Sequence, residues 1–169
     1  KMSMKMLEGT TDGDKSVSTF HWPADVNGTR MLTWTHKKGN DDQWLYLPSI
    51  KRIKRISSRN QSGSFMGSEF AFEDLSGQEV EKFTYKYLAD EQVGGRDTHK
   101  IERYPVNKDS GYSKQISWID KEYHQPLQIE YFDRKGGLMK RAIFDGFVMF
   151  DKVWRIGKIT MDNVQTKKK

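Results

Sequence analysis

Residues 127–132 are Leu127-Gln128-Ile129-Glu130-Tyr131-Phe132, and the turn Asp133-Arg134-Lys135-Gly136-Gly137 follows them. Leucine, isoleucine and tyrosine alternate with glutamine and glutamate, which is the pattern of a strand with one face in water. A second apolar segment begins at Leu138, directly after the two glycines. The stretch therefore predicts a β-hairpin, and it is the clearest one in the chain.

Similar segments recur along the chain between turn signals spaced by about eight to twelve residues, a spacing typical of all-β proteins. We predict strands at Thr29–His36, Gln43–Leu47, Glu81–Leu88, Thr98–Val106, Tyr112–Asp120, Leu127–Asp133, Leu138–Phe144 and Val153–Met161. In the first of these, one face carries Met31, Thr33 and Thr35, and the other carries Leu32, Trp34 and His36. Helix patterns are weak, although Ser68–Leu75 is compatible with a short helix capped by Ser68.

The composition indicates a folded domain that does not span a membrane. Of the 169 residues, 35% are hydrophobic and 12% aromatic, whereas disordered chains are poor in aromatics. The longest apolar run is Phe147–Phe150, far shorter than the roughly 18 residues of a transmembrane helix. No segment resembles a signal peptide, but the chain begins with Lys1, so we expect it to be a processed or trimmed piece.

Charge and cysteine content limit the choice of function. Three of the net six positive charges belong to the tail Lys167–Lys169, and the remaining excess is a weak reason to predict nucleic-acid binding. The absence of cysteine excludes disulfides, thiolate metal sites and a cysteine nucleophile.

Catalytic and metal-binding motifs are not recognisable. The four histidines are scattered, and Asp12-Gly13-Asp14 starts like a calcium loop but lacks its later Gly and Glu, which favours a hairpin turn. The acids Glu69, Glu73 and Asp74 fit solvated loop residues better than a pair for acid–base catalysis. We therefore expect no enzyme, no cofactor and no metal.

A basic run follows the second predicted strand. It contains Lys51, Arg52, Lys54 and Arg55, and in an extended strand these four would place charge on both faces. Charge on both faces suits an edge or rim strand, where it prevents sheet-to-sheet aggregation. An anionic headgroup or an acidic partner is a sharper alternative. Nucleic acid ranks last, because no aromatic residue is interleaved with the cations.

An apolar stretch, Ser64–Leu75, comes next. It places large apolar residues between small ones, which suits either a loop that packs in the core or a lining for an apolar ligand. We predict that an apolar hollow or its cover includes Trp34, Trp44, Phe65, Met66, Phe70, Phe72 and Leu75.

The same blocks resemble a known family. The resemblance rests on Asp42–Pro48, Lys51–Ile56, Ser62–Phe70 and Phe72–Leu75, and it continues through Trp118–Lys121, Pro126-Leu127 and Glu130–Asp133. These segments are similar to the outer-membrane lipoprotein-sorting proteins related to LolA, in the LolA-like group rather than LolA itself. The similarity covers roughly residues 20–165.

This resemblance implies a mainly β fold, in which a curved antiparallel sheet forms an unclosed half β-barrel and a few short helices cover its concave face. It implies a single LolA-like domain over 1–166 that lacks its N-terminal part, followed by the lysine tail 167–169. It also implies a periplasmic carrier that shelters an acyl chain of a lipid or lipoprotein and serves an inner-membrane exporter of the RND type. An RseB-like envelope-stress sensor is the alternative, and a basic nucleic-acid-binding domain is a remote one.

Overall fold

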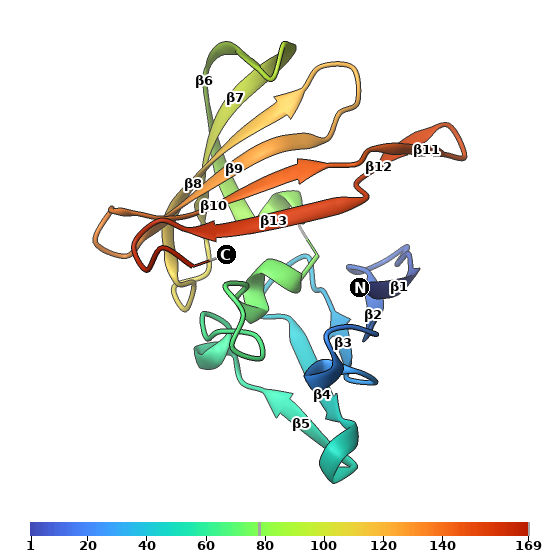
Figure 1. Ribbon diagram of the computed structural model, residues 1–169. Helices are drawn as coiled ribbons and strands as arrows, with labels where there is room; N and C mark the ends of the chain where they lie inside the picture. Colours follow the sequence, from blue (N-terminus) through green and yellow to red (C-terminus); the bar gives the residue numbers. More distant parts are fainter. Residues whose placement is uncertain (78, 169) are drawn as a thin grey trace. The chain divides into compact units, whose positions relative to one another are not determined.

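A computed structural model describes residues 1–77 and 79–168, and β-strands dominate it (Figure 1). The chain divides into two compact units, each with its own antiparallel sheet. The first comprises Lys1–Lys82 with Asn107–Ser110, and the second comprises Phe83–Val106 with Gly111–Lys169. Among the described residues, no helix has the length and apolar character needed to cross a membrane.

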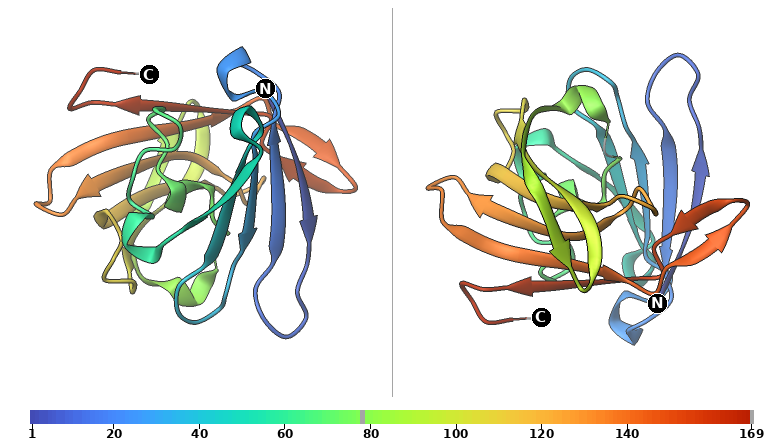
Figure 2. Two further views of the ribbon diagram at one scale, coloured as in Figure 1. Left: turned by 90° about the horizontal axis from the view of Figure 1, so that it is seen from below. Right: turned by 90° about the horizontal axis from the view of Figure 1, so that it is seen from above.

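The first unit is built on a five-stranded sheet in which consecutive strands are neighbours (Figure 2). Its strands are β1 (Met2–Leu7), β2 (Lys15–Phe20), β3 (Arg30–Trp34), β4 (Asp42–Leu47) and β5 (Arg52–Ile56). Because β1 and β5 pair on one side only, the sheet stays open. Short 3₁₀ helices connect or follow these strands: η1 (Ala24–Val26), η2 (Pro48–Ile50), η3 (Ser58–Asn60), η4 (Phe72–Leu75) and η5 (Val80–Lys82).

One face of this sheet is covered by residues 57–77, which we call the strap. Phe65 of the strap is only 4% exposed and forms a buried cluster with Met31, Leu45 and Ile56. Gln43 fixes the strap, since its Nε2 donates hydrogen bonds to the carbonyl of Phe72 at 3.0 Å and to Ser76 Oγ at 2.8 Å. Alternate residues of β3 and β4 therefore form a core with the strap, and this side is named the strap face.

The second unit contains a six-stranded antiparallel sheet in the order β13-β10-β9-β8-β7-β6, with a separate hairpin, β11–β12. Its strands are β6 (Phe83–Val93), β7 (Arg96–Pro105), β8 (Tyr112–Asp120), β9 (Pro126–Asp133), β10 (Leu138–Asp145), β11 (Val148–Phe150), β12 (Val153–Arg155) and β13 (Lys158–Asn163). The alternation seen in the sequence sets the sheet's faces, because Leu127, Ile129 and Tyr131 are buried while Gln128 and Glu130 are partly exposed.

The predicted fold class is confirmed: the protein is mainly β, its sheets are antiparallel and unclosed, and its few helices are short. The strand predicted at Val153–Met161 is divided into β12 and β13 where the chain passes so close to Gly146 that a Cβ at Gly157 would lie 2.3 Å from its carbonyl oxygen. The short helix begins at Phe72 rather than after Ser68, whose hydroxyl donates to the carbonyl of Phe65 at 2.6 Å. The single domain over 1–166 stays a prediction.

Candidate ligand-binding site

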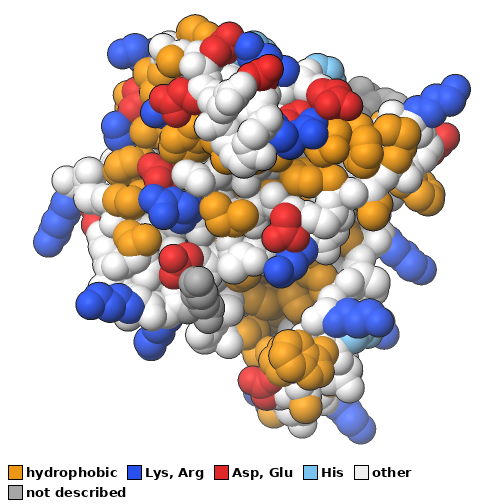
Figure 3. All heavy atoms as spheres, turned by 45° about the horizontal axis from the view of Figure 1, so that its top comes forward, with side chains coloured by type: hydrophobic (Ala, Val, Ile, Leu, Met, Phe, Trp, Pro, Cys, Tyr) orange, Lys and Arg blue, Asp and Glu red, His pale blue; other side chains and the backbone are white. Residues whose placement is uncertain are grey.

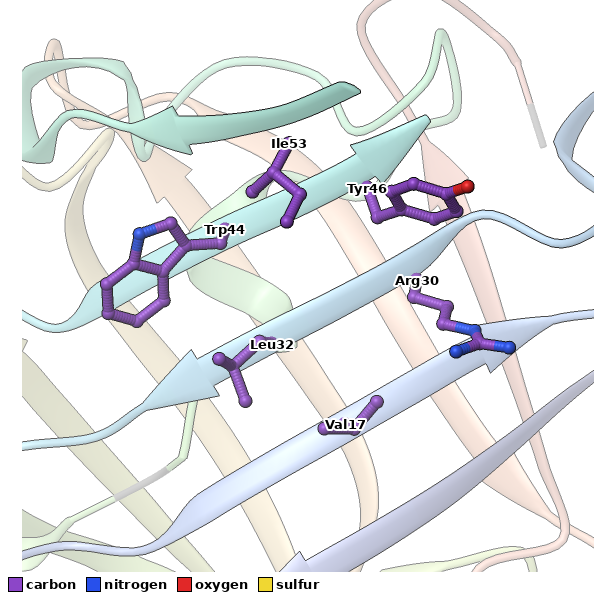
Figure 4. A pocket seen from close by; sticks show the side chains of 6 residues that line it. All are labelled: Val17, Arg30, Leu32, Trp44, Tyr46 and Ile53. Atoms are coloured by element: carbon purple, nitrogen blue, oxygen red, sulfur yellow. The ribbon is translucent and has the colours of Figure 1, made fainter. Parts of the chain in front are cut away.

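The opposite face of the five-stranded sheet carries a cavity of about 570 Å³ (Figure 4). We call this side the cavity face. The lining side chains come from β2, β3, β4 and β5 and point to the same side of the sheet: Val17, Arg30, Leu32, Trp44, Tyr46 and Ile53. Five of the six are apolar or aromatic, and the arginine is the only charged group among them.

Strand register brings these residues together from distant parts of the chain. Leu32 on β3 lies opposite Val17 on β2 and Trp44 on β4, which forms one row across the sheet. Arg30 lies opposite Tyr46, and Tyr46 lies opposite Ile53 on β5, which forms the adjacent row. Residues paired in this way share one face of a sheet and lie close enough for their side chains to touch. The cavity is therefore a product of register as well as of apolar content.

The row through Leu32 ends in a cation on each side. Lys5 on the edge strand β1 lies opposite Val17, and Arg55 on the edge strand β5 lies opposite Trp44. The Arg55 guanidinium carbon is 5.9 Å from the centre of the Trp44 ring. The same guanidinium group forms an ion pair with the Asp42 carboxylate. An apolar floor with cations at its borders can accept an amphiphile, whose apolar chain is buried while its anionic group meets a cation.

A polar network borders the cavity face beyond Arg55. His36 Nδ1 lies 2.6 Å from the Asp12 carboxylate, and Nε2 lies 3.2 Å from that of Asp42. The hydrogen bond from His36 lowers the pKa of Asp12 to about 2, and the same bond raises the pKa of His36. The Arg55 hydrogen bond is the main cause of a lowered pKa at Asp42. This network ties the β1–β2 connection to β4 and β5, and no group of it lines the cavity.

The predicted lining residues divide between the two faces. Trp44 lines the cavity, whereas Trp34 lies beside it, with Lys15 Nζ 4.0 Å from the centre of its ring. On the strap face, Phe65 is in the buried cluster and three other predicted residues pack against that cluster: Phe70, Phe72 and Leu75. Met66 is 38% exposed and has a positive φ of 52° at a turn of the strap. The ligand-binding role of this whole set stays a prediction.

The basic run lies at the edge of the sheet, as its charge pattern predicts. Arg52, Lys54 and Arg55 belong to the edge strand β5, and Lys51 ends η2 just before it with a φ of 50°. All four side chains are exposed. A contact with a headgroup or a partner stays a prediction.

Sequence reasoning did not identify five of the six lining residues: Val17, Arg30, Leu32, Tyr46 and Ile53. A usable signal was the placement of Leu32 on the face opposite Met31, but the sequence does not say which residues of neighbouring strands lie opposite Leu32. Among the described residues, no group of three or more His, Cys, Asp or Glu side chains could hold a metal ion.

Comparisons with known proteins agree with the fold. A family model described as "-like: Uncharacterized protein" matches residues 12–169. A domain named for outer-membrane lipoprotein sorting, from Vibrio parahaemolyticus, is 50% identical with a TM-score of 0.93, and the match covers 98% of this chain and 71% of that chain. A DUF1329 family protein from Desulfovibrio piger is 31% identical with a TM-score of 0.88, again over 98% and 71% of the two chains.

A more distant match shows the fold alone. A LolA superfamily protein from Nitrosomonas europaea has a TM-score of 0.67 at 17% identity, and the match covers 96% of this chain and 76% of that chain. The comparison with curated proteins found no match.

Proposed function

Because the chain belongs to the family of the outer-membrane lipoprotein-sorting domain and the DUF1329 protein and has a LolA-like fold, we propose that it is a periplasmic carrier of an acyl chain. The ligand in this proposal is a lipid or the lipid part of a lipoprotein. Its apolar chain lies in the cavity of the five-stranded sheet. Of the lining residues predicted from the sequence, Trp44 is the one that lines this cavity.

The observation that carries the proposal is the cavity itself. Its volume of about 570 Å³ lies within the range of roughly 300–1,000 Å³ typical of small-molecule sites. Burying an acyl chain against apolar surface gains roughly 0.8 kcal/mol per CH₂, so several methylenes suffice for a useful affinity. Carriage of this kind needs shape and apolar surface, and it needs no catalytic group.

The charge around the cavity supports an anionic headgroup in the ligand. Arg30 lines the cavity, while Lys5 and Arg55 lie at the two ends of the row that crosses its floor. Arg55 is already engaged with Asp42, so Arg30 and Lys5 are the better contacts for a phosphate or carboxylate. The family resemblance adds an inner-membrane exporter of the RND type that the carrier serves, and nothing in the cavity bears on that partner.

The test is a search for bound lipid followed by a titration. Native mass spectrometry of the purified chain should show a co-purified lipid that leaves on organic extraction. A fluorescent acyl probe with an uncharged headgroup should then bind the extracted protein with an affinity that changes little between low and high salt, because apolar burial dominates. Labelled DNA serves as the contrast, since binding to nucleic acid falls steeply with salt. Failure to bind the acyl probe, or strong salt-dependent binding of DNA, would contradict the proposal.

A further inference from the structure

The hairpin β11–β12 is a sheet of its own within the second unit, and it extends beyond the ends of β10 and β13, which it connects (Figure 1). Its two strands leave the six-stranded sheet close together, because Gly146 and Gly157 meet at its base. A side chain at Gly157 would collide with the carbonyl oxygen of Gly146. Glycine at this position therefore permits the close approach that starts the hairpin.

Aromatic contacts hold one face of the hairpin against the six-stranded sheet. The Trp154 ring stacks on Tyr123 with ring centres 4.1 Å apart, and Phe147 packs against the same ring at 5.3 Å. The Arg96 guanidinium carbon lies 3.7 Å from the centre of Tyr123, and Arg96 is itself paired with Asp120. Trp154, which pairs with Met149, thus fixes the hairpin to the sheet and sets the direction in which it points.

The other large apolar side chains of the hairpin strands are exposed. The exposed fractions are 57% for Val148, 58% for Met149 and 70% for Phe150, and Val153 is also exposed. Val148, Phe150 and Val153 share one face, because Phe150 pairs with Val153 and strand residues alternate. Met149 is exposed on the other face. Figure 3 shows that hydrophobic side chains gather in groups among charged ones on the surface in view.

The charged residues of the hairpin are mostly basic. Lys152 lies in the two-residue turn beside Asp151, and Arg155 lies opposite Val148 on the same face as the apolar group. Both cations are exposed, and neither forms an ion pair with any residue in the described part of the chain. Cations beside exposed apolar side chains are complementary to an anionic lipid surface.

We propose that the hairpin β11–β12 contacts the surface of an anionic lipid bilayer. Val148, Phe150 and Val153 share their exposed face with the cation Arg155, a combination that matches the apolar and anionic layers of such a surface. Contact stays at interfacial depth, because the outer edges of a two-stranded sheet carry unpaired N–H and C=O groups that cannot enter hydrocarbon. Phe150, Val148 and Met149 reach the boundary of the acyl chains, while Lys152 and Arg155 extend to the phosphates.

The experiment measures sedimentation of the full chain with vesicles of phosphatidylcholine containing phosphatidylglycerol. The hairpin variant combines Val148→Ser with Phe150→Ser. Its matched control combines Val80→Ser with Val106→Ser, which removes equally exposed valines elsewhere. We expect the hairpin variant to bind at least tenfold more weakly, a loss of about 1.4 kcal/mol, and the control to change less than twofold. No vesicle binding by the unaltered chain, or equal losses in both variants, overturns the proposal.

A second measurement locates the contact. The chain has no cysteine, so a single Met149→Cys substitution can carry a polarity-sensitive dye, with Val106→Cys as the control site. Anionic vesicles should shift the emission to the blue at position 149 and leave it unchanged at position 106. A third variant combines Lys152→Gln with Arg155→Gln. Its affinity for anionic vesicles should fall about tenfold or more, and its affinity for neutral vesicles should change little. Vesicle binding with no shift at position 149 overturns the proposal. The hairpin variants leave the residues that line the cavity unaltered, so their binding of the acyl probe separates this result from the carrier function.

Discussion

The same strands form both faces of the five-stranded sheet, but the strap covers only one of them. On the strap face, Met31 and Leu45 are closed off by the chain's own residues around Phe65. On the cavity face, their neighbours Leu32 and Trp44 border a cavity and no segment of the strap reaches them. The strap face therefore supplies folding free energy, while the cavity face keeps apolar surface available. An exposed apolar surface of this kind marks a binding site more often than a defect.

The largest effect expected is on the strap face. Phe65→Ala should lower the free energy of unfolding by about 3–5 kcal/mol, because it leaves a void among Met31, Leu45 and Ile56. Chemical denaturation measures this loss, and acyl-probe binding by the molecules that remain folded should not change. Weakened binding with little loss of stability would place the ligand against the strap instead.

The next effect is on the cavity face. Trp44→Ala should weaken acyl-probe binding by about tenfold, because the ring forms part of the floor beneath the ligand. The melting temperature should fall much less than in Phe65→Ala, since the ring is only half-buried. Trp34→Ala is the matched control, because that ring lies beside the cavity and does not line it. Equal losses of binding in the two tryptophan variants would argue against the cavity as the site.

The comparison of the two faces also shows what sequence could predict. Alternation in Thr29–His36 separated Met31 and Thr33, which are buried, from Leu32 and Trp34. Strand β8 was predicted with its observed ends, Tyr112–Asp120. Strand β2 was not predicted, because Lys15–Phe20 is rich in serine and threonine and has no apolar alternation.

The cavity could not have been derived from the same patterns. Alternation gives the face of each strand, but a cavity depends on which residues of neighbouring strands lie opposite each other, and that register is set by turns and by the whole sheet. Trp44 was predicted to line the cavity because it is large and apolar. Arg30 and Ile53 line the same cavity because they lie opposite Tyr46 on the neighbouring strands.

A smaller effect is expected at the sheet edge. Replacing Lys51, Arg52, Lys54 and Arg55 by Gln should change the free energy of unfolding by less than about 1 kcal/mol, because exposed charges contribute little to folding. In low salt the variant should bind an anionic acyl probe more weakly than the unaltered protein, and this difference should shrink in high salt, where the charges are screened. Thermal melts and probe titrations measure the two effects. A large loss of stability would contradict the exposed edge position of these four residues.

The smallest effect concerns pH. His36 has a raised pKa, so its charged form contributes stability that is fully present below its ordinary pKa of 6.5 and is lost as pH rises through the raised value. Asp12, with a pKa of about 2, contributes stability that is present above its ordinary pKa of 3.8 and is lost as pH falls toward 2. Between these limits the pair stabilises the fold most. His36→Gln should therefore lower the melting temperature at about pH 5 more than at about pH 9, and an equal shift at both would contradict this assignment.

The central claim is that the acyl ligand occupies the cavity face, and protection of introduced thiols tests it most directly. Leu32 lines the cavity and Met66 lies on the strap, yet both are 38% exposed, and the chain has no other thiol. The rate of alkylation of Leu32→Cys and of Met66→Cys is measured with and without a saturating single-chain anionic lipid. We predict that the lipid slows alkylation at position 32 at least tenfold and leaves position 66 unchanged. Protection at position 66 with none at position 32 would contradict the account.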